Sequence, residues 1–191
     1  GVDAVRYFAL REVPFGSDGN FSEDALVLRT NGDLANVLGN LVSRTIQMAI
    51  KYFNGVVENK QVSEEIDDDL INSKNSLKGL VDEKMTSYKV NEALEIIFEN
   101  LRKCNKYIDE TEPWVLSKDD NKLERLETII YNLLDNIRVS AILLEPFIPE
   151  TSKKILKSLN FESNDFSSLN TDHLKYDVGL EKPENLFNRI Q

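Results

Sequence analysis

The chain has 191 residues, enough for one domain with a sizeable buried core, and its 41% hydrophobic and 29% charged residues exclude a disordered chain. Its net charge of −10 disfavours a general nucleic-acid binder, because affinity for phosphates comes largely from Lys and Arg. The longest apolar run, residues 141–144, is far too short to cross a bilayer, and residues 1–20 carry no secretory signal pattern. A single cysteine, Cys104, excludes an intrachain disulfide and favours a cytoplasmic location.

Helical signals begin at the first residues. A helix is predicted over residues 2–11, followed by the Pro/Gly-rich connector VPFGSDGNF. Ser22 is a good N-cap, and the two acids after it favour the positive end of a helix dipole. Helical periodicity then continues to about residue 53, interrupted in one interpretation at Asn31-Gly32, and Asn54-Gly55 provides the stop.

Helical periodicity continues through most of the remaining chain. Helices are expected at residues 65–86, 90–109, 120–145 and 155–159. Pro146 and Pro149 separate the last two, and no convincing strand pattern or internal repeat is present. The predicted fold class is therefore all-α, an antiparallel helical bundle. We expect three parts: a connector at 1–21, the bundle at 22–160, and an irregular tail at 161–191 that packs back on the core.

One helix face carries side chains suited to reading a nucleic acid. Asn40, Arg44, Gln47 and Lys51 follow at i, i+4, i+7 and i+11, so they share a face, and no acid interrupts residues 34–53. On spacing alone a solvated face is the ordinary interpretation. Asn and Arg, however, present paired hydrogen-bonding groups that fit base edges. A local patch of this kind can bind RNA although the whole chain is acidic.

The only tryptophan follows a helix end. Trp114 comes after Pro113, and the cations Arg102, Lys103 and Lys106 lie on the preceding turns. Most single tryptophans pack in or near a core. A Trp on a turn beside cations is also a stacking platform for an unpaired base, a contact contributing about 1–3 kcal/mol.

Five stretches together resemble the region that follows the catalytic domain of methionyl-tRNA synthetases. These stretches are GVDAVRYFALREVPFGSDGNFSEDAL at 1–26, Asn40-x-x-x-Arg44, NKYID through Pro-Trp at 105–114, LEPFIP at 144–149, and PENLFNRI at 183–190. The resemblance covers essentially the whole chain, and its motifs agree in order and spacing. It implies an all-helical bundle of the class I synthetase anticodon-binding type.

The resemblance also implies roles for individual residues. Trp114 would stack on the first anticodon base, while Asn40 and Arg44 would hydrogen-bond anticodon bases. Weaker candidates for RNA contact are Asn105, Pro113, Gln47, Lys51 and Lys106. The implied partners are the anticodon loop (CAU) of methionine tRNA and the catalytic domain of the same parent chain, with no membrane and no DNA.

Catalytic motifs of that family are not found in the sequence. It has no HIGH-like motif, Gly-rich phosphate loop, nucleophile–base pair or cluster of metal ligands. We therefore expect an excised or truncated piece that is inactive alone, with no catalytic residue, metal or cofactor of its own. The parent would be an ATP-dependent methionine–tRNA ligase whose catalytic part holds ATP and commonly zinc.

Two alternatives remain open. One is the bundle of another class I synthetase, of the Val, Leu, Ile or Cys group. The other is an acidic helical protein-interaction module, which explains the negative charge more easily. Cys104 is expected to pack in the core, His173 has no predicted partner, and the acids of residues 63–69 are expected to form a solvated helix start.

Overall fold

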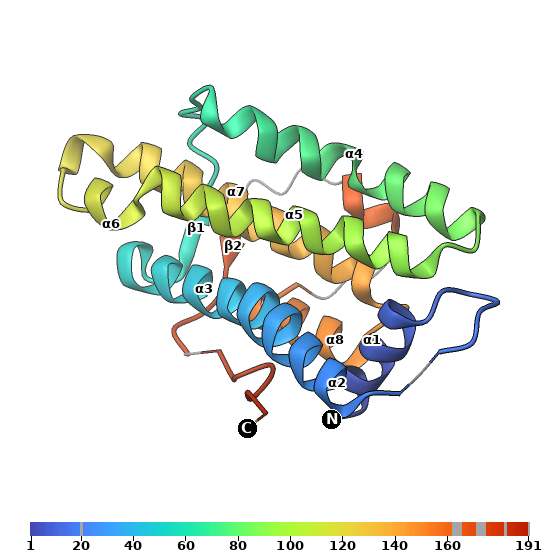
Figure 1. Cartoon of the computed structure of the whole chain (residues 1–191). Helices are drawn as coiled ribbons and strands as arrows, with labels where there is room; N and C mark the ends of the chain where they lie inside the picture. Colours follow the sequence, from blue (N-terminus) through green and yellow to red (C-terminus); the bar gives the residue numbers. More distant parts are fainter. Residues whose placement is uncertain (20, 162–165, 171–174, 182, 191) are drawn as a thin grey trace.

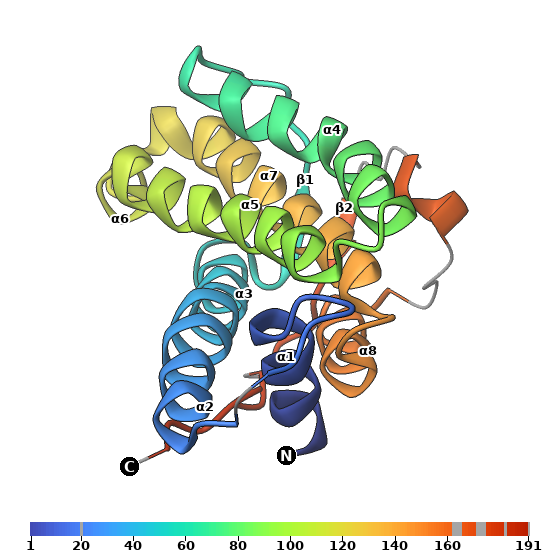
Figure 2. The same ribbon diagram turned by 45° about the vertical axis from the view of Figure 1, so that its right-hand side comes forward.

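The computed structural model describes residues 1–19, 21–161, 166–170, 175–181 and 183–190. Its helices are α1 Val2–Glu12, α2 Glu23–Arg29, the π-helix η1 Thr30–Gly39, α3 Asn40–Phe53, α4 Ile66–Thr86, α5 Val90–Thr111, α6 Pro113–Leu116, the 3₁₀ turn η2 Asp120–Lys122, α7 Leu123–Leu144, α8 Pro149–Ser158 and the 3₁₀ turn η3 Phe166–Asn170. Figures 1 and 2 show α4, α5 and α7 stacked together, with α3, α1 and α8 below them. The all-α bundle predicted from sequence is confirmed.

Helix α7 forms the centre of the bundle. Residues 125–144 are all buried, as expected for a helix that packs on several neighbours. The polar side chains on it are paired: Arg138 is 1% exposed and donates to Asp135 Oδ1 and to the carbonyl of Ser168. Lys74 of α4 and the hydroxyl of Tyr176 also donate to Asp135. Burial alone would raise the pKa of Asp135, but Lys74 and Arg138 outweigh it and hold the pKa below its ordinary value.

The chain stays helical from α2 through η1 into α3. The interpretation with a break at Asn31-Gly32 is therefore wrong, because η1 continues through this pair as a π-helix. Leu34 and Leu38 are fully buried, which holds this segment against the bundle. The side-chain amide of Asn105 on α5 donates to the Val37 carbonyl, a backbone group of the π-helix.

A two-stranded sheet fastens the tail to the bundle. Strand β1 (Val56–Glu58) pairs antiparallel with β2 (Lys175–Asp177), and Val57 lies opposite Tyr176. The sequence pattern predicts no strand here, because three-residue strands are too short to show an alternating pattern. Gly55 has φ +82°, and a Cβ there would lie 2.1 Å from the Gly179 carbonyl oxygen, so this turn requires glycine.

Polar side chains of the GVDAVRY stretch hold helix α1 against the rest of the bundle. Asp3 accepts hydrogen bonds from both the backbone N–H and the hydroxyl of Thr151 at the start of α8, each at 2.7 Å. Arg6 donates to the Phe147 carbonyl, and the Tyr7 hydroxyl donates to Asp33. The GVDAVRY stretch therefore joins α1 to both α8 and η1. Helix α8 begins at Pro149, six residues before the predicted start, because proline is well suited to the first helical position.

Candidate RNA-binding surface

Helix α3 presents the predicted polar face outward. Asn40 and Gln47 are exposed, and Arg44 is half-buried, whereas the opposite side of the helix is in the core. Gln47 donates to the Ser43 hydroxyl at 2.7 Å, and the Lys51 ammonium lies 5.1 Å from the Tyr52 ring centroid. The local sequence produces this division because apolar side chains recur every three or four residues along α3.

An ion pair joins this face to the end of α5. Arg44 Nη2 lies 2.9 Å from Asp109 Oδ1, and the Asp109 side chain is 67% exposed. Exposed pairs of this kind contribute only about 0–1 kcal/mol. Arg44 can therefore exchange Asp109 for another hydrogen-bond acceptor at little cost.

A sharp turn at the end of α5 positions the tryptophan. Glu112 adopts the left-handed conformation with φ 44°, so α5 ends and α6 begins in a new direction. Pro113 occupies the first position of α6 and is buried, while Trp114 is 44% exposed. Figure 1 shows α6 at the same end of the bundle as the C-terminal part of α3. Arg44 is paired with Asp109, which is five residues before Trp114 in the chain.

The three cations that precede the Pro113-Trp114 turn, Arg102, Lys103 and Lys106, are ion-paired with nearby acids. Lys106 lies 3.3 Å from Glu110, Lys103 lies 2.9 Å from Asp69, and Arg102 pairs with Glu95. The carboxylates lower the positive potential that these cations offer to a phosphate. The Asn105 amide points inward to carbonyls of α5 and η1.

Cys104, His173 and the acids of residues 63–69 are also singled out in the sequence, and the structure bears on two of these three predictions. Cys104 is fully buried, and burial raises the pKa of its thiol to about 12, which suits a packing role. His173 lies outside the described residues. One acid of residues 63–69 differs from the predicted solvated face: Asp67 is completely buried and accepts two hydrogen bonds from Arg125 and one from Tyr107. The sequence gives no local signal for this, since both partners are at least 40 residues away.

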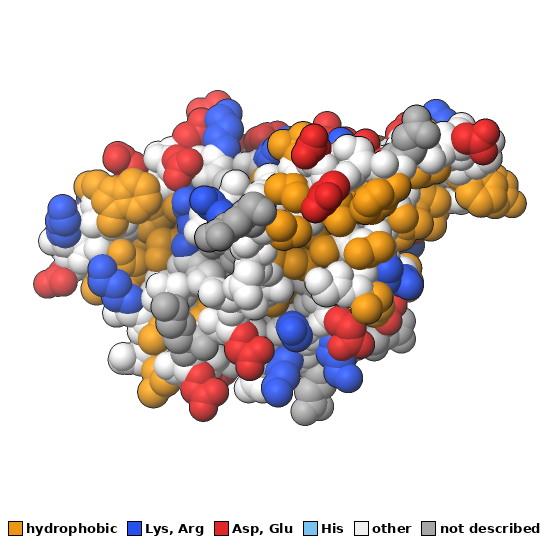
Figure 3. Space-filling view, turned by 60° about the horizontal axis from the view of Figure 1, so that its bottom comes forward, with side chains coloured by type: hydrophobic (Ala, Val, Ile, Leu, Met, Phe, Trp, Pro, Cys, Tyr) orange, Lys and Arg blue, Asp and Glu red, His pale blue; other side chains and the backbone are white. Residues whose placement is uncertain are grey.

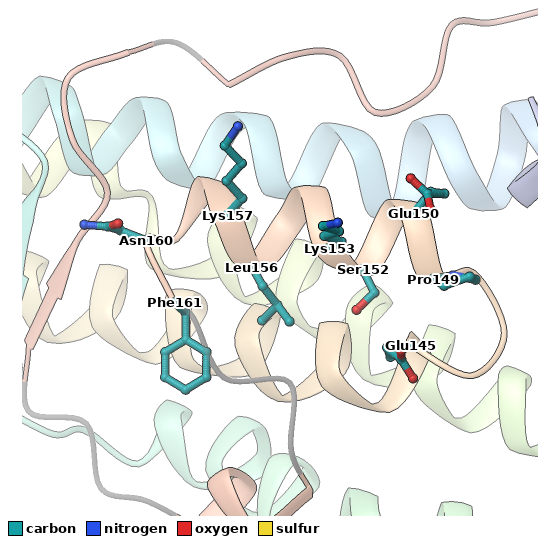
Figure 4. A pocket seen from close by; sticks show the side chains of 9 residues that line it. All are labelled: Glu145, Pro149, Glu150, Ser152, Lys153, Leu156, Lys157, Asn160 and Phe161. Carbon is teal, nitrogen blue, oxygen red and sulfur yellow. The ribbon is translucent and has the colours of Figure 1, made fainter.

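A separate hollow lies between α8 and the end of α7. It has a volume of about 650 Å³, and Figure 4 shows Leu156 and Phe161 directed to one side of α8 and Lys157 to the other. Its rim mixes acids and lysines.

Within the described ranges, no group of three or more His, Cys, Asp or Glu side chains is arranged to hold a metal ion. None of the helices in those ranges is both long and apolar enough to cross a membrane.

Comparisons with known proteins agree with this geometry. Residues 57–191 match the family described as the anticodon binding domain of methionyl tRNA ligase, and residues 1–46 match class I tRNA synthetases of the methionine type. The methionine–tRNA ligase of Caldanaerobacter subterraneus subsp. tengcongensis is 48% identical over the whole chain and 30% of its own length. That of Clostridium perfringens is 50% identical over 88% of the chain and 26% of its own length.

Solved structures show the same fold. The apo methionyl-tRNA synthetase of Mycobacterium tuberculosis superposes with a TM-score of 0.93 at 37% identity, covering the whole chain and 39% of that protein. The same enzyme in complex with methionyl-adenylate superposes with a TM-score of 0.92, covering 99% of the chain and 38% of that protein. Helical bundle, exposed polar face and matches together define the anticodon-binding region of a class I aminoacyl-tRNA synthetase.

The chain belongs to the methionyl-tRNA synthetase family. It spans less than a third of the length of the two curated relatives described above. Neither the bundle of a Val, Leu, Ile or Cys synthetase nor an acidic interaction module is supported by these matches.

Proposed function

We propose that this domain reads the CAU anticodon loop of methionine tRNA through Trp114, Asn40 and Arg44. The observation that supports this proposal is the Arg44–Asp109 ion pair, since Asp109 is five residues before the exposed Trp114. An unpaired first base would stack on the exposed indole, as single-stranded bases do on aromatic side chains. Asn40 and Arg44 would hydrogen-bond base edges from α3, each contributing about 1–3 kcal/mol to discrimination.

The weaker candidates take secondary roles in this proposal. Gln47 and Lys51 extend the α3 face and would touch the loop backbone. Pro113 is buried and would act by fixing the direction of Trp114. Lys106 would approach the RNA only after leaving Glu110, and Asn105 would support the surface from within.

The whole protein is proposed to be an ATP-dependent methionine–tRNA ligase acting in the cytoplasm. Its catalytic part would hold ATP and commonly zinc, would activate methionine, and would charge the acceptor end of the tRNA bound here by its anticodon. Residues 1–21 would connect that part to the bundle at 22–160, with 161–191 as a tail against the bundle. Identity to methionine–tRNA ligases over the whole chain supports this assignment.

The test compares two anticodon stem-loops, one with CAU and one with a changed first base. Trp114 fluorescence is recorded at low salt during titration of the 191-residue chain with each RNA. We expect tighter binding and stronger quenching with CAU. Because Trp114→Ala removes the fluorophore, its binding is measured by electrophoretic mobility shift, where the preference for CAU should disappear. Equal binding of both loops by the unaltered chain would refute anticodon recognition by this domain.

A matched variant separates base recognition from charge. Arg44→Lys keeps the positive charge but cannot present the paired donors of a guanidinium. We expect it to reduce the preference for CAU by about tenfold, corresponding to the lower part of the 1–3 kcal/mol range. If Arg44→Lys retains the full preference, Arg44 does not read a base edge.

A further inference from the structure

The C-terminal strap, defined here as residues 183–190, forms one wall of a polar groove along η1 and α3. The groove has a volume of about 470 Å³. Its helical wall includes Asn36, Gly39, Asn40 and Ser43, and its strap wall includes Asn185, Asn188 and Arg189. Among the residues that the structure describes, no acid lines the groove, although the chain carries a net charge of −10. Figure 3, which brings the lower side of Figure 1 forward, shows much of the middle of that face as uncharged surface.

Two asparagines of the π-helix hold the strap in place. Asn31 exchanges two hydrogen bonds of 2.9 Å with the backbone of Ile190, one through its amide and one through its oxygen. Asn36 accepts a hydrogen bond of 2.6 Å from Arg189 Nη2. The two asparagines are five residues apart on the π-helix, and both side chains bond the strap. The position of Arg189 is therefore fixed by neutral partners.

The charge of Arg189 is not neutralised by any of the residues that the structure describes. No described carboxylate lies within 4.0 Å of it, whereas Arg44, Arg102, Lys103 and Lys106 all have acidic partners. A guanidinium has five N–H donors, and the bond to Asn36 uses one of them. The remaining donors match the oxygens of a phosphate, which guanidinium groups bind in bidentate geometry.

We propose that this groove binds the sugar-phosphate backbone of the anticodon stem-loop, with Arg189 as the phosphate ligand. The proposal rests on the proposed function, because Asn40 lies both on the face that reads bases and on the wall of the groove. A base edge held by Asn40 brings its own backbone to the groove, and the amides there offer donors to ribose and phosphate oxygens. Arg189 adds affinity without adding sequence preference.

The test removes the charge while keeping the strap attached. Arg189→Gln removes the charge and keeps a polar amide, and it leaves untouched the two hydrogen bonds between Asn31 and the Ile190 backbone that hold the strap. Lys78→Gln is the matched control: it also removes one positive charge, on α4, which lies on the opposite side of the bundle from the strap in Figures 1 and 2. Binding of the two stem-loops is measured by Trp114 fluorescence at several salt concentrations, and circular dichroism checks the folding of each variant.

Loss of one phosphate contact lowers the slope of log K against log salt by about 0.7–0.9. We expect this change in Arg189→Gln for both RNAs, with the ratio between CAU and the changed loop preserved, and no change of slope beyond about 0.2 in Lys78→Gln. Equal slopes in Arg189→Gln and Lys78→Gln would overturn the groove proposal alone, whereas no binding of either RNA by the unaltered chain would overturn both proposals. The preference of the unaltered chain for CAU tests the proposed function separately, so failure of one proposal is distinguishable from failure of the other.

Discussion

Asp3 provides a sharp test of what the N-terminal motif does. Its carboxylate is 7% exposed, and Oδ2 accepts both the backbone N–H and the hydroxyl of Thr151 at 2.7 Å. Hydrogen bonds to a charged group contribute about 1.5–3 kcal/mol each. Asp3→Ala removes both bonds and leaves a buried N–H without a partner. We therefore expect a loss of about 3 kcal/mol in the free energy of unfolding.

Urea unfolding followed by circular dichroism at 222 nm measures this loss. With a slope of about 3 kcal/mol per molar urea, the midpoint should fall by about 1 M without a change of slope. Asp3→Asn keeps one oxygen acceptor but not the charge, so it should lose about half as much. Val5→Ala, on the exposed side of α1, should change stability by less than about 0.5 kcal/mol. A midpoint shift in Asp3→Ala no larger than that of Val5→Ala would refute this role for Asp3.

Two further predictions concern charged residues. The pKa of Asp135 is lower in the folded state than in the unfolded chain, so its contribution to stability is present above about pH 4 and is lost as pH falls through the folded pKa. Asp135→Asn leaves Arg138 buried without its carboxylate partner. Urea unfolding at pH 7 should show a loss of about 3–5 kcal/mol in the free energy of unfolding, and stability should depend less on pH in the acid range. An unchanged dependence of stability on pH would contradict this. Asp109→Asn frees Arg44 and should tighten binding of both stem-loops up to about fivefold at low salt, whereas weaker binding would contradict the prediction. Glu110→Gln, which releases Lys106 instead, is the matched control.

The helices of this fold follow from local sequence. Apolar spacing, the Ser22 cap and the stop at Asn54-Gly55 are all read within a few residues, and the structure places α2 and α3 between them. The polar face of α3 follows from the same spacing, because helical periodicity depends only on near neighbours. Spacing alone does not assign a role to Asn40 or Arg44; their roles come from the family resemblance and stay predictions.

Features that depend on distant partners could not be predicted in this way. Asp67 looks like one acid among several, and only the fold brings Arg125 and Tyr107 to it. The groove beside Asn40 has no sequence signal either, because its second wall comes from a strap about 150 residues away. The PENLFNRI stretch is visible in the sequence as part of the resemblance, but nothing in it shows that Arg189 lies beside Asn36 and Asn40.

The manner in which the strap is attached has a consequence for the order of folding. Contacts of the C-terminal part of the chain span long stretches of sequence: β1 pairs with β2, just before the strap, across roughly 120 residues, and Ile190 of the strap bonds Asn31 across 159. Closing so long a loop adds little to the free energy but delays contact formation, so the strap should dock after the helices have assembled. Ile190 and Arg189 are exposed and attached by few bonds, so this segment should also open first in hydrogen exchange. The groove is thus a feature that the native bundle can lose and regain without unfolding.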